Sequence, residues 1–365
     1  MYNCEFCFSK YGKKKLVRLY FNLPLFRHYD FSTIRKVRVF FEKCVNCNTV
    51  FNYRSFLKEK KIFIKPSYLR SNQTQSKTVS NKKKILLVQN SQAKIIKKFI
   101  NKRRKLNFLD IGCFDGALLK ELNKNFKKSN FFGLESNFNF KKIFPKTKNF
   151  RLIENINKFD KKIDCVIFSF SIMYIDNLKE VLNHVKKILN DKGIIYLQIP
   201  DIKKNSLYSL MGDQFIIPTE KAIKNIFNIF QFKITKHVSS DFKKDLIFIA
   251  SKKNIKKIKF RKDKNFENSL KKNKILEEKI SDYKGTKLLI LGTTINAAFA
   301  NEILENQNIF VDENQLKVGK YFRNNKVFHP SKVEKNRKVM LNYGVFNNYL
   351  QKKLKHKYKL NSIKI

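Results

Sequence analysis

A glycine-rich turn followed by a spaced acid is the strongest chemical signal in the sequence. Residues 109–116 read LDIGCFDG, an apolar strand pattern that runs into a turn, and a helix pattern starts at Ala117. Gly112 and Gly116 would let the backbone approach a ligand closely and adopt positive φ angles. The next apolar strand ends on Glu135, whose carboxylate could accept both hydroxyls of a ribose. The pattern lacks the third glycine of the dinucleotide fingerprint, and it predicts a nucleoside site.

Two C-x-x-C pairs have the spacing of a metal site: Cys4, Cys7, Cys44 and Cys47. Each pair can occupy a tight turn, so two such turns can place four thiolates around one zinc ion. A four-cysteine site has no open coordination position, so the metal would be structural. Redox cysteines and a disulfide are the alternatives, although a cytoplasmic location argues against a disulfide. Cys113 and Cys165 lie on or beside predicted strands, where we expect them to be small buried hydrophobic residues.

The composition is that of a folded and very basic protein. Hydrophobic residues make up 42% of the 365 residues, which predicts two or three domains with proper cores. Lys and Arg number 79 against 29 Asp and Glu, which gives a net charge of +50. The abundance of Lys, Asn, Ile and Phe is typical of A/T-rich coding sequence, but a polyanionic partner is an open alternative. Non-specific attraction to nucleic acid at low salt is expected in either case.

The sequence contains no targeting or membrane signal that we recognise. No apolar run reaches the length of a membrane span, and the first residues lack the apolar core of a signal peptide. Together with cysteines that show no disulfide pattern, this predicts a cytoplasmic protein.

Apolar strands alternate with amphipathic helices between residues 85 and 251. The seven expected strands are 107–111, 131–135, 149–153, 164–168, 194–199, 232–238 and 246–250. The expected helices are 93–102, 117–125, 178–189 and 220–230. Because strands that alternate with helices form parallel sheets, we predict an α/β domain whose mostly parallel sheet is covered by helices on both faces.

The flanking regions predict three domains. Residues 1–70 would be a zinc-binding domain, and the polar stretch 71–84 a connector. The central domain would span 84–251, and a Lys- and Glu-rich stretch would form one or two linking helices after it. A second, shorter α/β pattern follows in a C-terminal domain of residues 285–365. Its expected strands are 287–291, 308–311 and 339–342, and its expected helices are 295–304 and 345–354.

The order of these parts resembles the three-domain C-methyltransferases of deoxysugar biosynthesis. The turn at Gly112 resembles motif I of the class I S-adenosylmethionine-dependent methyltransferases. Residues 292–297 (GTTINA), 311–314 (VDEN) and 329–331 (HPS) resemble segments of the family's C-terminal domain. The resemblance implies a Rossmann-like seven-stranded methyltransferase sheet, a small N-terminal zinc-binding domain and a smaller C-terminal Rossmann-like α/β domain. It also implies S-adenosylmethionine as the cofactor.

The resemblance further implies which residues contact the cofactor. The turn supplies the motif I residues, and the acid of the next strand takes the ribose. A serine at the end of the fourth strand would lie along the methionine end, and an asparagine after the third strand would lie near the adenine. The implied cofactor residues are Asp110, Gly112, Gly116, Glu135, Asn155 and Ser169.

The catalytic residues are where the chain departs from the family. Methyl transfer to a carbon beside a ketone needs a base, and the family's base is a histidine. Asp213 and Gln214 stand in the Glu-His place of that segment, and no histidine is present. Gln214 cannot titrate. Asp213 could act as the base if burial raised its pKa, or it could simply cap a turn or helix. Tyr68 is the nearest match to a family tyrosine that could donate to a developing oxyanion, and packing at a domain junction is its alternative role.

Three functions remain open at this point. The first is a methyltransferase for a small molecule, namely a nucleotide-linked sugar or glycan precursor, with C-methylation favoured. The second is an RNA methyltransferase, which the charge and the zinc module suit. The third is a non-catalytic protein built on a methyltransferase fold, which the missing histidine suits.

Overall fold

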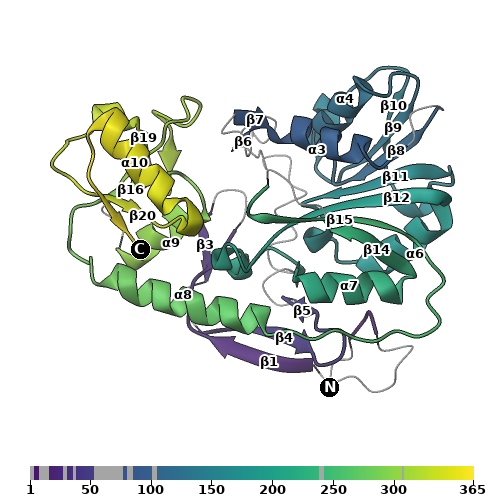
Figure 1. Ribbon diagram of the computed structural model, residues 1–365, viewed down its shortest axis with the longest axis horizontal. Helices are drawn as coiled ribbons and strands as arrows, with labels where there is room; N and C mark the ends of the chain where they lie inside the picture. Colours follow the sequence, from purple (N-terminus) through teal and green to yellow (C-terminus); the bar gives the residue numbers. More distant parts are fainter. Residues whose placement is uncertain are drawn as a thin grey trace. The chain divides into compact units, whose positions relative to one another are not determined.

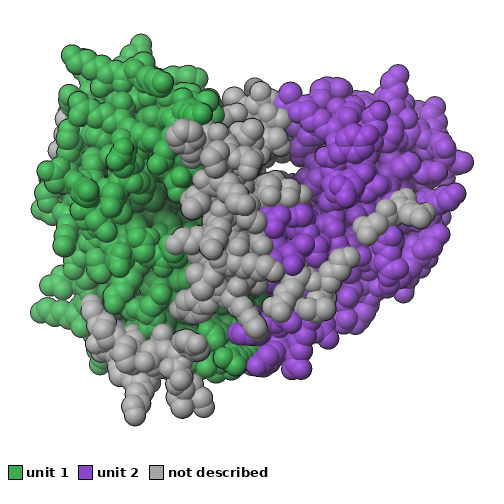
Figure 2. All heavy atoms as spheres, turned by 180° about the vertical axis from the view of Figure 1, so that it is seen from behind, with its two compact units in different colours: residues 1–19, 41–201, 214–263 green, residues 20–40, 202–213, 264–365 purple. Residues whose placement is uncertain are grey.

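The computed structural model describes most of the chain as two compact units. The described residues are 4–7, 16–27, 31–35, 38–52, 77–79, 85–100, 105–237, 242–305 and 308–365. The first unit comprises residues 1–19, 41–201 and 214–263, and the second comprises 20–40, 202–213 and 264–365 (Figure 2). Tyr68, a predicted oxyanion donor, lies outside the described residues. The predicted domain limits of 1–70, 84–251 and 285–365 stay a prediction.

The first unit is built on a seven-stranded sheet with the order β10-β9-β8-β11-β12-β15-β14. Its strands are β8 (Asn107–Ile111), β9 (Asn130–Leu134), β10 (Phe150–Ile153), β11 (Ile163–Ser169), β12 (Leu189–Pro200), β14 (Phe232–His237) and β15 (Asp245–Lys252). The pairs among β10, β9, β8, β11 and β12 are parallel, and β15 runs antiparallel to both of its neighbours. The α/β class and the mostly parallel sheet are confirmed.

Helices cover both faces of this sheet because its central strands are apolar on both sides. They are α3 (Val88–Lys97), α4 (Ala117–Asn123), α5 (Phe138–Ile143), α6 (Leu178–Ile188) and α7 (Glu220–Ile229) (Figure 1). On one face Phe108 packs in a core with residues of α3 and α4. On the other face Leu109 packs in a core with residues of α6 and α7. Adjacent strand residues point to opposite faces, so β8 is buried from both sides.

The first helix begins five residues earlier than the sequence indicated, at Val88 rather than at Ala93. Its buried side includes two polar residues, Ser91 and Gln92. The prediction relied on the spacing of apolar residues. Because Ser91 and Gln92 are polar, the first turn of the helix shows no apolar spacing, and the sequence does not predict it. Before this helix, β6 (Lys77–Val79) pairs antiparallel with β7 (Ile85–Leu87).

The cysteine-bearing segments belong to the core of the first unit. β1 (Leu16–Phe21), β4 (Val39–Cys44), β5 (Val50–Phe51) and β13 (Ile216–Ile217) form a second sheet in that order. Phe6 stacks on Phe51 with ring centroids 5.4 Å apart, and it meets Phe230 edge-on at 6.3 Å. These rings join the cysteine turns to the hydrophobic core that also holds α6 and α7.

The second unit contains a six-stranded sheet with the order β18-β19-β17-β16-β20-β21. Its strands are β16 (Leu289–Leu291), β17 (Ile309–Val311), β18 (Tyr321–Phe322), β19 (Asn325–Phe328), β20 (Val339–Leu341) and β21 (Ser362–Lys364). Its helices are α8 (Asn265–Ser281), α9 (Ile295–Ile303) and α10 (Asn347–Tyr358), and a small hairpin joins β2 (Leu25–Phe26) to β3 (Thr33–Arg35). All pairs except β18 with β19 are parallel in the larger sheet. A second α/β fold is therefore present.

Helices of membrane-spanning length and hydropathy do not occur in the part of the chain that the structure describes.

Candidate functional site

The glycine-rich turn joins the end of β8 to the start of α4. Gly112 has a φ of 82° and Gly116 a φ of 73°, both in the left-handed region that favours glycine. The backbone nitrogen of Gly112 donates to the carbonyl of Leu134 at 2.8 Å. A Cβ added to Gly112 would lie 2.5 Å from the Cβ of Ser171, so this glycine also allows the segment after β11 to approach. The turn thus sits where β8 and β11 separate, at the point where the strand order reverses.

Glu135 follows β9 directly and is held against this turn. Its side chain is 7% exposed. The backbone nitrogen of Phe114 donates to Oε2 at 3.0 Å, and that of Asn137 donates to Oε1 at 2.8 Å. Burial raises the pKa of Glu135, while these amide bonds lower it in part. The hydroxyl of Ser136 also donates to Oε1, over a long 3.4 Å, so Oε2 keeps a further lone pair and Oε1 could accept a ligand hydroxyl in place of Ser136.

Asp110 lies in β8 two residues before Gly112, and it is 2% exposed. Burial, followed by repulsion from Glu135, raises the pKa of Asp110 to about 8. Its Oδ1 has no hydrogen-bond partner among the described residues. Since buried polar atoms in folded proteins are nearly always bonded, this oxygen is available to a ligand.

Two aromatic residues beside the turn adopt the left-handed conformation. Phe114 has a φ of 50° in the glycine-rich turn, and Phe170 has a φ of 55° directly after β11. This region is strained for a bulky residue, and such strain is concentrated at functional loops. Ser171, the next residue, is buried, and its Oγ has no hydrogen-bond partner among the residues described. The carboxyl ends of β8 and β11 therefore carry both strain and unbonded polar atoms.

Ser169 at the end of β11 belongs to a partly buried polar network that the sequence did not predict. The Nε2 of Gln92 donates to Oγ of Ser169 at 2.7 Å and to Oε1 of Gln198 at 2.8 Å. The Nε2 of Gln198 in turn donates to Oδ2 of Asp245 at 2.8 Å, and the hydroxyl of Tyr196 donates to Oε1 of Gln198 at 2.7 Å. Burial raises the pKa of Asp245 to about 7. Because Ser169 accepts from Gln92, its own hydroxyl proton is free to point elsewhere.

Asn155 is the N-cap of a short helix. Its Oδ1 accepts from the backbone nitrogen of Asn157 at 2.9 Å, which caps the short helix η2 (Ile156–Lys158). The side chain is exposed. No bond connects it to the other predicted cofactor residues among those described, so the structure leaves the predicted adenine contact as a prediction.

Asp213 and Gln214 are both buried, at 0% and 1% exposure. The Nε2 of Gln214 lies 3.4 Å from the hydroxyl of Tyr174, at the end of the short helix η3 (Ile172–Tyr174) that follows β11. The Oε1 of Gln214 has no hydrogen-bond partner within the described chain. Gln214 thus belongs to the first unit beside the segment after β11, and Asp213 is the last residue of a segment of the second unit.

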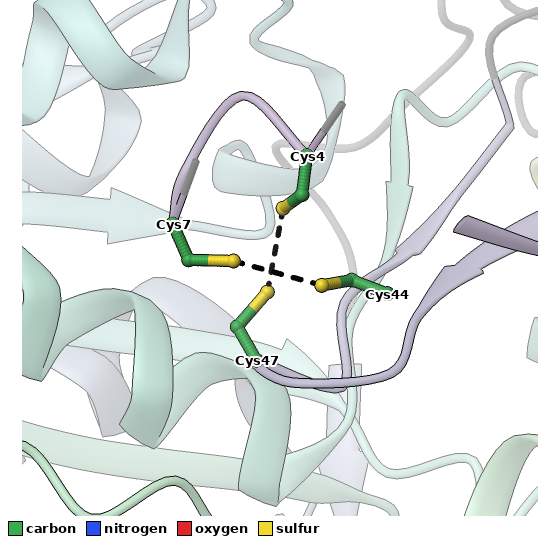
Figure 3. Close-up of side chains that lie close together, drawn as sticks. All are labelled: Cys4, Cys7, Cys44 and Cys47. Carbon is green, nitrogen blue, oxygen red and sulfur yellow. Dashed lines mark hydrogen bonds between the residues drawn. The ribbon is translucent and has the colours of Figure 1, made fainter. Parts of the chain in front are cut away.

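The four paired cysteines converge on one point, as Figure 3 shows. Their sulfurs all lie within 4.8 Å of one another, and each side chain is 0% exposed. Sγ of Cys4 is 3.5 Å from Sγ of Cys47, and Sγ of Cys7 is 3.6 Å from Sγ of Cys44. A tetrahedral zinc ion about 2.3 Å from each sulfur would place the sulfurs roughly 3.8 Å apart. The cluster therefore has the size and donor set of a four-thiolate zinc centre.

The second unit has its own glycine turn, and the side chain of Tyr343 occupies the space beside its glycine. Gly292 after β16 has a φ of 79°, and a Cβ added there would lie 2.1 Å from the hydroxyl of Tyr343. That hydroxyl donates to the carbonyl of Leu291 at 2.8 Å and lies 3.2 Å from Oγ1 of Thr294. The first glycine of the corresponding turn in the first unit, Gly112, instead faces the small side chain of Ser171.

Residues 87–237 match the family model described as "Methyltransferase domain". No curated protein sequence matches the chain.

Solved structures that resemble the chain are methyltransferases of low sequence identity. A putative O-methyltransferase from Nostoc punctiforme is 16% identical over 44% of this chain and 56% of its own, with a TM-score of 0.37. A S-adenosylmethionine-dependent methyltransferase from Clostridium acetobutylicum is 15% identical over 46% of this chain and 92% of its own, with a TM-score of 0.37. The chain thus spans little more than half of the Nostoc protein and most of the Clostridium protein.

The matched residues begin at the last strand residue before α3 and end with β14, and they include the glycine-rich turn and Glu135. The sequence match therefore covers most of the part of the chain that forms the seven-stranded α/β fold with the glycine-rich turn.

Proposed function

We propose that this chain is an S-adenosylmethionine-dependent methyltransferase whose acceptor is a small molecule. The proposal rests on one hydrogen bond, in which the backbone nitrogen of Phe114 in the glycine-rich turn donates to the carboxylate of Glu135. This arrangement holds a fixed carboxylate beside a turn whose two glycines adopt positive φ angles. A ribose with two free hydroxyls matches that acceptor chemistry.

The residues around the turn fit the remaining parts of the cofactor. Glu135 would hold the ribose, and the glycine backbone would lie against the nucleoside. The unbonded Oδ1 of Asp110 and Oγ of Ser171 offer polar contacts to the charged methionine end. Ser169, oriented by Gln92, would add a hydroxyl donor there. When bound, S-adenosylmethionine supplies an electrophilic methyl group on a sulfonium.

The acceptor we favour is a nucleotide-linked sugar or glycan precursor, with methylation at carbon. Support comes from the resemblance of the whole chain to three-domain sugar C-methyltransferases, including the second α/β fold after residue 285. In that reaction Asp213 would remove a proton from the carbon beside the ketone, and Tyr68 would donate to the developing oxyanion.

Gln214 gives this proposal its distinctive feature. An amide cannot accept a proton in water, so Gln214 would bind the acceptor by hydrogen bonds and leave proton transfer to another group. Its Oε1 has no bond among described residues, so it can accept from an acceptor hydroxyl. If the acceptor were itself a hydroxyl or amine, it would need less help from a base.

We also propose that the four-cysteine cluster binds one structural zinc ion. The four sulfurs are fully buried, and the segments that carry them pack in the core of the first unit. A closed set of four thiolates leaves no position for a substrate. The ion would therefore hold the cysteine turns together and take no part in methyl transfer.

The test is incubation of the purified protein with methyl-labelled S-adenosylmethionine and a panel of nucleotide-linked keto sugars. Transfer of label to a sugar carbon supports the proposal. Transfer to RNA, with none to the sugars, would replace it with an RNA methyltransferase. Cofactor binding without transfer to any acceptor would favour a non-catalytic role.

A further inference from the structure

A basic hollow lies in the first unit, separate from the glycine-rich turn. It encloses about 710 Å³. Of its nine lining residues, six are cationic and the other three are asparagines. The cations are Lys105, Lys124, Lys127, Lys128, Lys148 and Arg151.

The hollow lies at the opposite edge of the sheet from Glu135. Lys105 precedes β8, Asn130 is the first residue of β9, and Arg151 is near the start of β10. β8, β9 and β10 are parallel, so their amino ends share one edge. The nucleoside site uses the carboxyl ends of β8 and β9. A ligand in the hollow therefore would not be the cofactor.

The concentration of charge in the hollow exceeds that of the chain as a whole. Cations are 79 of 365 residues overall, yet six of nine here. No acid lines the hollow. Glu121 bonds Lys124 at 2.6 Å, and the other five cations form no ion pair with any described residue. Clustered like charges raise the local positive potential, which attracts an anion to the hollow.

The three asparagines that line the hollow are neutral, and their side chains are already bonded. The Nδ2 of Asn149 donates to Oδ1 of Asn123 at 3.0 Å, and the Nδ2 of Asn130 donates to Oδ1 of Asn107 at 2.7 Å. None of the lining residues is aromatic. The surface thus offers many cations for phosphates and no ring for stacking a base.

We propose that this hollow binds the sugar-phosphate backbone of a nucleic acid, without selecting its base sequence. Six cations exceed what the diphosphate of one nucleotide requires, and the long exposed side chains can follow successive phosphates. Binding would be driven by release of counterions and would weaken steeply with salt. The proposal does not depend on the methyltransferase reaction.

The test is fluorescence anisotropy of the full chain with a labelled DNA duplex over a series of salt concentrations. Each phosphate neutralised contributes about 0.9 to the slope of log affinity against log salt. The variant Lys127→Gln/Lys128→Gln/Arg151→Gln should lower the slope by about 2 to 3 and weaken binding at least about tenfold at low salt. Duplexes of unrelated sequence should give the same result.

The matched control removes three charges from α8: Lys271→Gln/Lys272→Gln/Lys279→Gln, all exposed. The proposal predicts that this variant keeps the parent slope. Equal losses in both triple variants would show attraction by net charge alone and would overturn the proposal. An unchanged slope in the first variant, or binding of inorganic triphosphate in the hollow with no duplex bound there, would also overturn it. Thermal melting confirms that each variant is folded.

Discussion

The backbone nitrogen of Phe114 donates to Oε2 of Glu135 at 3.0 Å, and this bond joins the glycine-rich turn to the acid of the neighbouring strand. Phe114 itself has a φ of 50°, so the residue that donates this bond is also a strained one. The strain at Phe114 and the position of Glu135 are thus parts of one arrangement. A ligand that binds Glu135 would be sensitive to the conformation of the turn.

Gly112 and Gly285 allow conformational strain to be separated from steric overlap. Both have a φ near 80°, but a Cβ at Gly112 would meet Ser171 at 2.5 Å, whereas one at Gly285 would meet nothing within 4 Å. Gly285→Ala should therefore cost about 1 kcal/mol of unfolding free energy. Gly112→Ala should cost about 1–3 kcal/mol more because of the overlap. Urea denaturation measures both, and equal losses would contradict the tight approach of Ser171.

Asp110 should make stability fall as pH rises. Burial, followed by repulsion from Glu135, raises the pKa of Asp110 from its ordinary 3.8 to about 8 in the folded protein. Between these values the unfolded chain has released the proton while the folded protein keeps it. The unfolding free energy then declines with rising pH, by at most about 1.4 kcal/mol per pH unit for this group.

Asp110→Asn removes that titration. The variant should therefore gain stability relative to the parent as pH rises from about 4 to 8. Urea denaturation across this range gives the comparison. Parallel stability curves for parent and variant would mean that Asp110 is ionised in the folded protein.

The cysteine cluster should contain one zinc ion per chain. Cys4→Ser and Cys47→Ser each remove one ligand from a closed site and should lower the metal content of untagged protein to near zero. Cys165→Ala is the control, since Cys165 is also fully buried but lies in β11 outside the cluster. Elemental analysis that finds no zinc in the parent, or zinc retained in Cys4→Ser, would refute the site.

Asp213→Asn tests the proposed base once an acceptor is known. General-base contributions are typically about 10²–10⁴-fold, so turnover should fall more than a hundredfold. Affinity for S-adenosylmethionine should be unchanged, which also shows that the buried substitution is tolerated. Turnover within a few-fold of the parent would eliminate Asp213 as the base and favour an acceptor that needs none.

The parts of the fold that could be predicted from sequence are those with strong local signals. The strand before Gly112, the turn itself and the helix from Ala117 follow from apolar periodicity and glycine placement. The sequence predicts a carboxylate at the end of this strand, because Glu135 directly follows an apolar run and the two can be recognised together without knowing the fold. The four cysteines were foreseen as a group from their spacing, and the structure places their sulfurs together.

Contacts between distant polar residues could not be predicted. Gln92, Gln198 and Asp245 are far apart in sequence, and each looks like an ordinary surface residue until the fold buries it. The left-handed conformations of Phe114 and Phe170 could not be predicted from the sequence either, because positive φ angles are commonly expected only of glycine, Asn and Asp. Tertiary packing imposes both features.

The central claim is that Glu135 holds the ribose of S-adenosylmethionine, and calorimetric titration of the cofactor tests it most directly. Glu135→Ala removes a buried charged acceptor of ribose hydroxyls, a loss of about 1.5–3 kcal/mol, or roughly 10- to 150-fold in affinity. Glu154→Gln, an exposed acid after β10, is the matched control and should bind as the parent does. Weakened binding in Glu135→Ala alone is the predicted result. Equal affinity in the parent and Glu135→Ala, or no binding by the parent, would contradict the account.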